Sequence, residues 1–391
     1  MAAAITALPQ WSWAASLPTD LRITRIVAFN LVSKRPKMVG KNSRLDVHGD
    51  GATDRMVRLY TNSGHEGLGC CRANEQTLSS ILGKNPFDYF QAKEPAMRSP
   101  LGAGTMPLWD LAGKALKKPV YELLGAKGSR KVRVYDGSIY FADLLPEYMS
   151  NWEDRFKQEI DDGFARGHTA FKIKIGRGAK WMPAEEGFDR DKAVVSLIRK
   201  HAGPRVELGV DANNGYDLAR AKRFLSELPG ANLAFVEELF PEKVEEDLEL
   251  KQFIKSLKLR ALIADGETQQ TLEPFKPFIE ARAIDIYQGD MNHFGIEGIL
   301  TEAAWAAKQK LLVGPHNWGS LLGFYQILTM GAAIPNLYRA ENDPLTNDIL
   351  TAEGYELKNG VTIVPDQPGF GLGINEPAFA SAVKPSVDLK L

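Results

Sequence analysis

The pattern of apolar and polar residues divides the chain into two parts with different textures. Residues 23–32 and 55–61 have the composition and alternation of β-strands, and the turn residues 62–64 mark a break between strand signals. Residues 86–124 instead place apolar residues at helical spacing, most clearly over residues 107–116. Strands followed by helices predict an α+β domain at the start of the chain.

From residue 131 onward, short apolar or β-branched runs alternate with stretches of helical pattern. Eight such runs over roughly 230 residues fit an α/β fold of the (β/α)8 type, a modified TIM barrel. An open doubly wound sheet is the rival, but no Gly-x-Gly-x-x-Gly turn follows any of the runs. The predicted strands are residues 132–135, 170–175, 206–210, 233–236, 262–264, 284–287, 311–313 and 337–338.

Composition excludes several classes of partner. Lys and Arg number 48 against 49 Asp and Glu in 391 residues, a formal net charge of -1. We therefore expect no nucleic-acid partner and no anionic membrane surface as partner. No apolar run reaches the roughly 18 residues of a membrane span.

The cysteines and the first residues bear on location. Cys70 and Cys71 are the only cysteines, and their adjacency is a poor geometry for a disulfide, so we expect a reducing, cytoplasmic setting. Residues 1–17 are mildly apolar but carry no positive charge ahead of the apolar stretch. We interpret them as part of an N-terminal extension, with a processed export signal as the alternative.

Ionisable residues follow the predicted barrel strands at one phase, where the active sites of such barrels lie. Each alone has a structural reading as a helix cap, a turn residue, an exposed lysine or a buried histidine. Together they indicate a site, because barrel interiors disfavour unpaired charge. The set is Lys172 and Lys174 on one strand and, one per following strand, Asp211, Glu237, Glu267, Asp290, His316 and Glu341.

The grouping indicates metal-assisted proton abstraction. Asp211, Glu237 and Glu267 supply three hard oxygen ligands from neighbouring strands, an arrangement suited to Mg2+. We expect the mutual repulsion of Lys172 and Lys174, together with the cation, to push at least one lysine toward neutrality, which would make it a base.

On the other side of the expected ion, Asp290 fixes the tautomer of His316 and raises its basicity. A metal-bound substrate carboxylate flanked by two bases is suited to removing the proton α to that carboxylate.

These motifs resemble the enolase superfamily, in the mandelate racemase/muconate lactonizing enzyme family, and most closely its mandelate racemase-type subgroup. The resemblance covers nearly the whole chain from about residue 21. The matching pieces are Lys172-Ile173-Lys174, Asp211-Ala212-Asn213, residues 235–238, 264–267, 288–290 and 315–316, and in the N-terminal part residues 108–115 and 119–125.

The resemblance implies a role for each residue. It makes Asp211, Glu237 and Glu267 the Mg2+ ligands, Lys174 one general base, and His316 with Asp290 the other. By the same resemblance, Lys172 contacts the substrate carboxylate and tunes Lys174, Asn213 lies beside the metal, and Glu341 hydrogen-bonds the substrate carboxylate. The remaining expectations are a mobile cap loop at residues 34–48, where Asn42 and Arg44 read the distal end of the substrate, and a second cap loop at residues 64–69.

Two points stay open. Asp265 shares a strand face with Glu267, so either is a candidate third ligand, although Glu267 fits the subgroup pattern, and Glu238 leaves the choice on its own strand slightly open. The gap between Lys174 and Asp211 is longer than usual for the family, and the extra segment 176–187 either lines the site mouth or serves only an oligomer contact.

The predicted domains are an N-terminal extension (1–20), an α+β capping domain (21–130), the barrel (131–365) and a C-terminal segment that returns to the cap (366–391). The resemblance also implies a homo-oligomer and a small carboxylate substrate.

The leading hypothesis is a Mg2+-dependent lyase that dehydrates an acid sugar to a 2-keto-3-deoxy acid. The main alternative is a racemase or epimerase of a 2-hydroxy acid or acid sugar. Cycloisomerase chemistry is less favoured because a His-Asp dyad is present, and a non-catalytic ligand-binding barrel is the remaining alternative.

Overall fold

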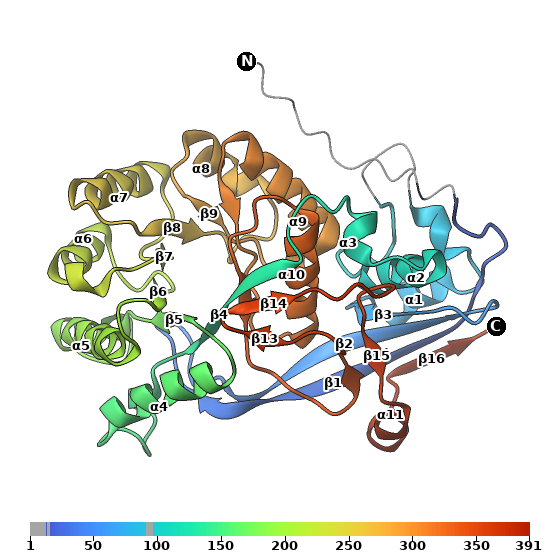
Figure 1. Cartoon of the computed structure of the whole chain (residues 1–391), viewed down its shortest axis with the longest axis horizontal. Coiled ribbons are helices and arrows are strands. Elements are labelled where there is room, and N and C mark those ends of the chain that lie inside the picture. Colours follow the sequence, from blue (N-terminus) through green and yellow to red (C-terminus); the bar gives the residue numbers. More distant parts are fainter. Residues whose placement is uncertain (1–12, 14–15, 91–96) are drawn as a thin grey trace.

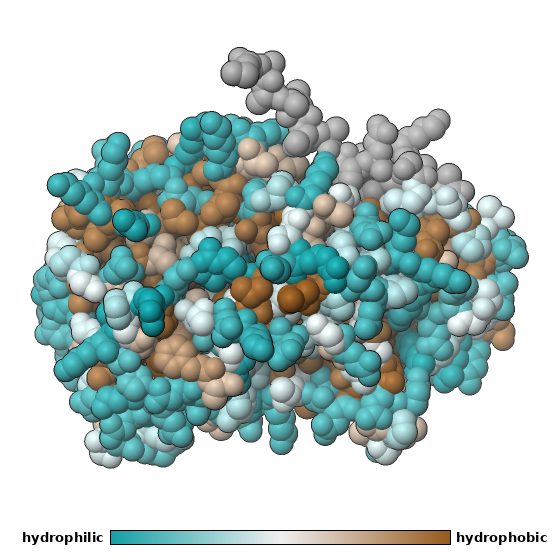
Figure 2. Space-filling view, viewed as in Figure 1, coloured by the Kyte–Doolittle hydropathy of each residue, from teal (hydrophilic) through white to brown (hydrophobic). Residues whose placement is uncertain are grey.

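The structure, a computed structural model, describes residue 13, residues 16–90 and residues 97–391, so most of the predicted extension lies outside the described residues. An antiparallel sheet lies beside a barrel that is covered by helices (Figure 1). Within these described ranges, no helix is long and apolar enough to cross a membrane. Figure 2 shows polar and charged residues over most of the visible face, with apolar residues scattered between them.

The antiparallel sheet has the strand order β16-β1-β2-β3. Its strands are β1 (Ile23–Val39), β2 (Gly49–Thr61), β3 (Glu66–Cys70) and, from the end of the chain, β16 (Val387–Lys390). Buried and exposed residues alternate along the second half of β1, as expected where one face of a sheet covers a core. The expected cap loop at residues 34–48 is therefore wrong in its first part, because residues 34–39 continue β1.

The glycine-rich stretch at residues 64–69 is not a second cap loop, which corrects the expectation from the resemblance. Most of it belongs to β3, which packs against α2 (Met106–Leu116). A Cβ on Gly67 would clash with the carbonyl oxygen of Pro107, and one on Gly69 would lie 2.6 Å from Cγ of Met106. The glycines are there because the strand and the helix approach each other closely.

The helices of the N-terminal part only partly follow the prediction. Within the described part of residues 86–124, the structure has the short 3₁₀ helix η2 (Pro86–Tyr89), α2 and α3 (Val120–Leu123). An unpredicted helix, α1 (Glu75–Ile81), begins after Asn74, whose side chain accepts a hydrogen bond from the Thr77 amide. Asparagine is a preferred residue at the N-cap position of a helix, so Asn74 is the residue from which the start of this helix could have been predicted.

Eight parallel strands form the barrel and confirm the predicted fold class. β11 pairs with β4 and closes the ring, while a single parallel bridge joins Val313 to Leu337. The predicted eighth strand at residues 337–338 is thus misplaced, because the strand itself begins at Ala340. The strands are β4 (Lys131–Ile139), β5 (Ala170–Lys174), β6 (Glu207–Asp211), β7 (Phe235–Glu237), β8 (Leu262–Asp265), β9 (Ile286–Tyr287), β10 (Leu312–Val313) and β11 (Ala340–Asn342).

Helices follow the strands and cover the outside of the barrel (Figure 1). They are α4 (Trp152–Ala165), α5 (Ala184–Ala202), α6 (Leu218–Glu227), α7 (Val244–Ser256), α8 (Lys276–Ala281), α9 (Met291–Lys308) and α10 (Leu321–Ala333), with the 3₁₀ helices η3 (Ala142–Leu144), η4 (Arg177–Ala179), η5 (Pro229–Ala231) and η6 (Glu273–Phe275) between elements.

After the barrel the chain runs back toward the antiparallel sheet, where β16 pairs with β1. On the way, β14 pairs antiparallel with β4. The elements of this segment are β12 (Leu350–Thr351), β13 (Leu357–Lys358), β14 (Val361–Ile363), β15 (Gly373–Ile374) and α11 (Glu376–Ala382).

Candidate active site

Parallel pairing brings the predicted site residues of three neighbouring strands side by side. Lys174 stands opposite Asp211 in the register of β5 and β6, and Asp211 stands opposite Glu237 in that of β6 and β7. Lys172 shares the interior face with Lys174, because side chains alternate along a strand. All four side chains are buried, so their charges face each other with little water between them.

The three predicted metal ligands form one group. Carboxylate oxygens of Asp211, Glu237 and Glu267 lie within 4.8 Å of one another. Oxygens on opposite sides of a Mg2+ ion are about 4.2 Å apart, since each Mg–O bond is about 2.0–2.1 Å long. Glu267 Oε2 is buried and accepts no hydrogen bond from any described residue, although His316 Nε2 lies 3.3 Å from it. Three hard carboxylates with one such open oxygen fit a divalent cation of the Mg2+ type.

The two lysines bind to these carboxylates. Lys172 Nζ lies 2.6 Å from Glu237 Oε1 and 2.8 Å from Glu341 Oε1. Lys174 Nζ pairs with Asp211 Oδ2 and donates to Asn213 Oδ1 at 2.9 Å. Both ammonium groups are therefore held by oxygens on the interior face of the barrel.

The protein's own charges favour the charged form of both lysines. Burial lowers the pKa of Lys172, but the charges of Glu237 and Glu341 outweigh it and hold this pKa well above its usual value. Burial likewise opposes the charge of Lys174, and Asp211 reverses that effect, so its pKa is raised as well. Lysine repulsion is the weaker effect here, and a neutral lysine requires the positive charge of the cation.

His316 and Asp290 form the predicted dyad. His316 Nδ1 lies 2.7 Å from Asp290 Oδ2, and the other Asp290 oxygen accepts hydrogen bonds from the Asn292 and His293 amides at the start of α9. His316 Nε2 lies 3.3 Å from Glu267 Oε2, which points the free edge of the ring at the carboxylate group. Burial lowers the pKa of His316, but Glu267 and the hydrogen bond to Asp290 outweigh it and raise this pKa to about 10.

Glu341 and Asn213 complete the ring of polar groups. Glu341 Oε2 accepts from the Asn317 amide at 3.0 Å. Gly137 on β4 makes room for Glu341, because a Cβ there would lie 2.6 Å from Glu341 Oε1. Asn213 Nδ2 donates to both Glu267 Oε1 and Glu238 Oε2 at 3.2 Å, so Asn213 joins the predicted metal group to its neighbour.

The two predicted cap-loop residues have different surroundings. Asn42 Oδ1 accepts from the Arg44 and Leu45 amides at 2.9 and 2.6 Å, so this side chain holds its own turn. Arg44 is exposed, and its guanidinium can donate to Asn214 beside the site when the Asn214 amide is turned so that its oxygen faces Arg44.

The long segment 176–187 contacts the cap loop. Trp181 Nε1 donates to the Asn42 carbonyl at 2.6 Å, and Lys180 Nζ donates to the Arg44 carbonyl at 2.8 Å. Ser43 Oγ donates to the Ala212 carbonyl at 2.6 Å, directly after β6. These contacts hold the loop against the barrel.

Sequence reasoning missed an aromatic wall near Lys174. Tyr140 and Trp318 stack with ring centroids 4.7 Å apart, and His48 meets Tyr140 edge-on at 4.7 Å. Lys174 Nζ lies 5.1 Å from the Tyr140 ring centroid. Tyr140 directly follows the first barrel strand and Trp318 follows His316 by two residues, which was the available signal.

The carboxylates next to the predicted ligands form a group of their own. Asp265, the open alternative to Glu267, groups with Glu238 and Glu242 instead. Burial and the charges of nearby carboxylates raise the pKa of both Glu238 and Asp265 well above their usual values.

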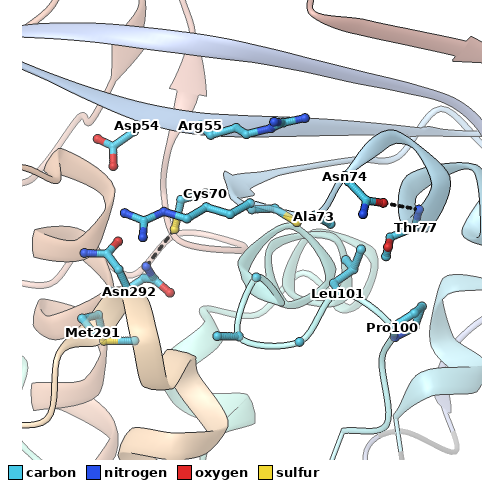
Figure 3. A pocket seen from close by; sticks show the side chains of 16 residues that line it. Asp54, Arg55, Cys70, Ala73, Asn74, Thr77, Pro100, Leu101, Met291 and Asn292 are labelled. Atoms are coloured by element: carbon cyan, nitrogen blue, oxygen red, sulfur yellow. Dashed lines mark hydrogen bonds between the residues drawn. The ribbon is translucent and has the colours of Figure 1, made fainter. Parts of the chain in front are cut away.

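A cavity of about 360 Å³ lies elsewhere, between the antiparallel sheet and the start of α9. Figure 3 shows Cys70, Asn292 and Leu101 among its lining residues. It contains none of the predicted site residues.

Comparisons with known proteins agree with this geometry. Residues 155–378 match the family model described as enolase C-terminal domain-like. Arabinonate dehydratase of Saccharolobus solfataricus is 32% identical over 280 residues, 70% of this chain and 69% of that protein. D-Galactarolactone cycloisomerase of Agrobacterium fabrum is 28% identical over 290 residues, 70% of each chain. A solved galacturonate dehydratase variant from Geobacillus sp., complexed with Mg, has a TM-score of 0.86 and 29% identity and covers 93% of this chain and 96% of that one.

Proposed function

Since the chain belongs to the enolase C-terminal domain-like family, we propose that it is a Mg2+-dependent hydro-lyase that converts an acid sugar into a 2-keto-3-deoxy acid. The observation that carries the proposal is the placement of Lys174 and the His316–Asp290 dyad on either side of one carboxylate group. The names of the relatives, which include arabinonate and galacturonate dehydratases, support an acid-sugar substrate.

In this proposal Asp211, Glu237 and Glu267 hold the Mg2+ ion. When bound, the ion supplies the positive charge that offsets these carboxylates and stabilises the negative charge that develops on the substrate carboxylate.

The chain's own residues bind the substrate and move the protons. Lys172 and Glu341 orient the substrate carboxylate. Neutral Lys174 removes the proton from C2, and the electron pair left on C2 forms the C2–C3 double bond as the C3–O bond breaks. His316, held in one tautomer by Asp290, gives its proton to the departing hydroxyl, which leaves as water. The resulting enol becomes the 2-keto product by gaining a proton at C3 and losing the proton of its C2 hydroxyl.

The same two bases support a second candidate, racemisation or epimerisation at C2. Each base reaches one face of C2, so one removes the proton and the other returns it to the opposite face. The relationship to a cycloisomerase agrees with isomerase chemistry on this scaffold. Product mass separates the two reactions, because dehydration loses one water and inversion leaves the mass unchanged.

The test is a panel of aldonic, aldaric and uronic acids incubated with the protein and Mg2+ and scored for 2-keto acid. His316→Asn serves as the matched background for each compound. A substrate that yields a 2-keto acid with wild-type protein alone supports the proposal. Bound metal without product or C2 deuterium exchange for the whole panel would leave a non-catalytic barrel as the better interpretation.

The domain bounds, the cap-loop residues, the location and the oligomeric state are also proposals. We propose residues 21–130, 131–365 and 366–391 as cap, barrel and returning segment, with Asn42 and Arg44 at the distal end of the substrate. Two adjacent free cysteines support a cytoplasmic location, and light scattering tests the expected homo-oligomer.

A further inference from the structure

A second group of carboxylates lies beside the predicted Mg2+ ligands. Glu238, Glu242 and Asp265 each place a carboxylate oxygen within 4.8 Å of those of the other two. Glu238 directly follows Glu237, and Asp265 ends β8, so this group sits next to the first one but shares no residue with it.

Two of these three side chains are deeply buried, and each has one carboxylate oxygen without a hydrogen-bond partner among the described residues. Glu238 is 1% exposed and Asp265 is 3% exposed. Among the residues that the structure describes, Glu238 Oε1 and Asp265 Oδ1 have no hydrogen-bond partner. A buried carboxylate in this condition is costly unless a cation or a proton neutralises it.

Neighbouring side chains do not supply that cation. The charges that act most strongly on Asp265 are those of Glu238, Glu242 and Asp247, all of them acidic. The charge of Arg44 acts on Glu238, but Arg44 is exposed and forms no ion pair with Glu238 within the described part of the chain.

We propose that Glu238, Glu242 and Asp265 bind a second hard divalent cation, of the Mg2+, Mn2+ or Ca2+ class. A donor set made only of carboxylate oxygens selects such ions. Oxygens on opposite sides of an ion are about 4.2 Å apart for Mg2+ and about 4.8 Å apart for Ca2+. Glu242 is half-buried, which gives the ion an entrance from the surface. Its carboxylate accepts a hydrogen bond from the Thr268 hydroxyl at 3.0 Å.

The second cation positions the first site. Glu238 Oε2 accepts from Asn213 Nδ2, and the same amide donates to Glu267 Oε1. An ion on the other oxygen of Glu238 fixes this chain of contacts and thereby the orientation of Glu267. Its role is to position a ligand and not to touch the substrate, so the inference does not depend on which acid sugar is used.

Metal counting tests the proposal on the full chain. The protein is stripped with a chelator and titrated with Mn2+, and bound ions per chain are counted by the loss of the free Mn2+ resonance signal. We expect two ions for the wild type and one each for Asp265→Asn and Glu242→Gln, with the second ion weakened more than about tenfold. Glu245→Gln, on the exposed face of α7, is the matched control and keeps two.

The half-buried Glu242 guards against misfolding, since its variant disturbs the core less than Asp265→Asn. A single ion in the wild type, lost in Asp211→Asn and kept in Asp265→Asn, overturns the second site and leaves the proposed function intact. Two ions that both persist in Asp265→Asn and Glu242→Gln also overturn it. Two ions, of which Asp265→Asn removes one and Asp211→Asn removes none, support the second site and overturn the ligands of the proposed function.

Discussion

Two buried clusters of charged side chains meet at the end of β5, and they use their carboxylates differently. In the first, Arg177 pairs with Asp143 at 2.8 Å and with Asp191 at 2.6 Å. Asp191 Oδ2 also accepts from the Gly176 amide and from the Tyr216 hydroxyl, both at 2.8 Å. Within the described residues, the buried side-chain atoms of this cluster all have partners.

The second cluster is the candidate active site. Its carboxylates outnumber its lysines, and Glu267 Oε2 accepts no hydrogen bond from the described residues, with only the 3.3 Å ion-pair contact to His316 Nε2 recorded for it. The contrast teaches that burial and charge do not by themselves mark a site. A cluster that only supports the fold is satisfied by its own residues, whereas a cluster that binds a cation and a substrate keeps an oxygen open for them.

The largest expected effect comes from replacing the two bases of the second cluster, Lys174 and His316. Lys174→Ala should abolish turnover and C2 deuterium exchange, a loss of about 10²–10⁴-fold or more, because it removes the abstracting group. His316→Asn should lower product formation by a similar factor but leave C2 exchange measurable in D2O. Wild-type rates in both variants would falsify the two-base site, and loss of exchange in His316→Asn alone would reverse the two roles.

Removing the Arg177 guanidinium from the first cluster should lower the stability of the fold instead of changing the chemistry. Arg177→Met leaves Asp143 and Asp191 buried without their partner, and breaking such a pair costs about 3–5 kcal/mol of unfolding free energy. Urea denaturation measures the loss, with Arg205→Met, at an exposed position, as the control. An unchanged unfolding midpoint would show that the Arg177 cluster contributes no stability and would remove the contrast.

Metal removal tests the open oxygens of the second cluster. Chelation should abolish activity and added Mg2+ should restore it. Asp211→Asn should cost about 10²–10³-fold in kcat, the scale of one lost electrostatic contact to a developing negative charge. Full turnover of the stripped enzyme is the contrary result, and Mn2+ binding by the variant separates lost affinity from lost catalysis.

The sequence predicted those parts of the site that follow from strand periodicity. Lys172, Lys174 and Asp211 lie in regular strands, so alternation and parallel register were enough to bring them together. Contacts between distant segments carry no such signal: Trp181 reaches Asn42 across 139 positions. The assignment of Asp265 likewise depended on the turn at Gly266, which separates it from Glu267.

The fold shows the same limit. Strong apolar runs located most barrel strands, but the eighth begins at Ala340, because Leu337 belongs to a single bridge that periodicity cannot distinguish from a strand. The resemblance assigned residues 34–39 to the cap loop, yet β1 continues through them to Val39, and Lys34 and Val39 both pair with β2. Tertiary pairing decided both positions.

A further buried carboxylate, Glu302, extends the comparison to the pH dependence of stability. Both oxygens of Glu302 lack a partner among the described residues. Burial and then the charge of Asp290 raise its pKa well above the usual value. The folded state therefore holds a proton that the unfolded state has lost, and stability should fall as pH rises above the unfolded pKa. Glu302→Gln should remove this contribution, so urea denaturation at about pH 5 and about pH 8 should show the variant gaining stability over wild type as pH rises. Parallel curves would contradict it.

The smallest expected effect concerns the segment that links the two clusters. Arg177 anchors the start of residues 176–187, and Trp181 in that segment holds the cap loop over the candidate site through its 2.6 Å hydrogen bond to the Asn42 carbonyl. Trp181→Phe keeps an aromatic ring beneath Lys41, whose Nζ lies 4.0 Å from the Trp181 ring centroid, but it removes the donor. One such hydrogen bond contributes about 1 kcal/mol, so KM should rise about fivefold while kcat and Mn2+ affinity stay near wild type. Trp305→Phe is the matched control, because that ring also lies under a lysine, Lys276 at 4.6 Å, but on the outer helix α9. Equal KM values in the two variants would mean that other contacts hold the loop. The Arg177 cluster would then support the fold without affecting the reaction.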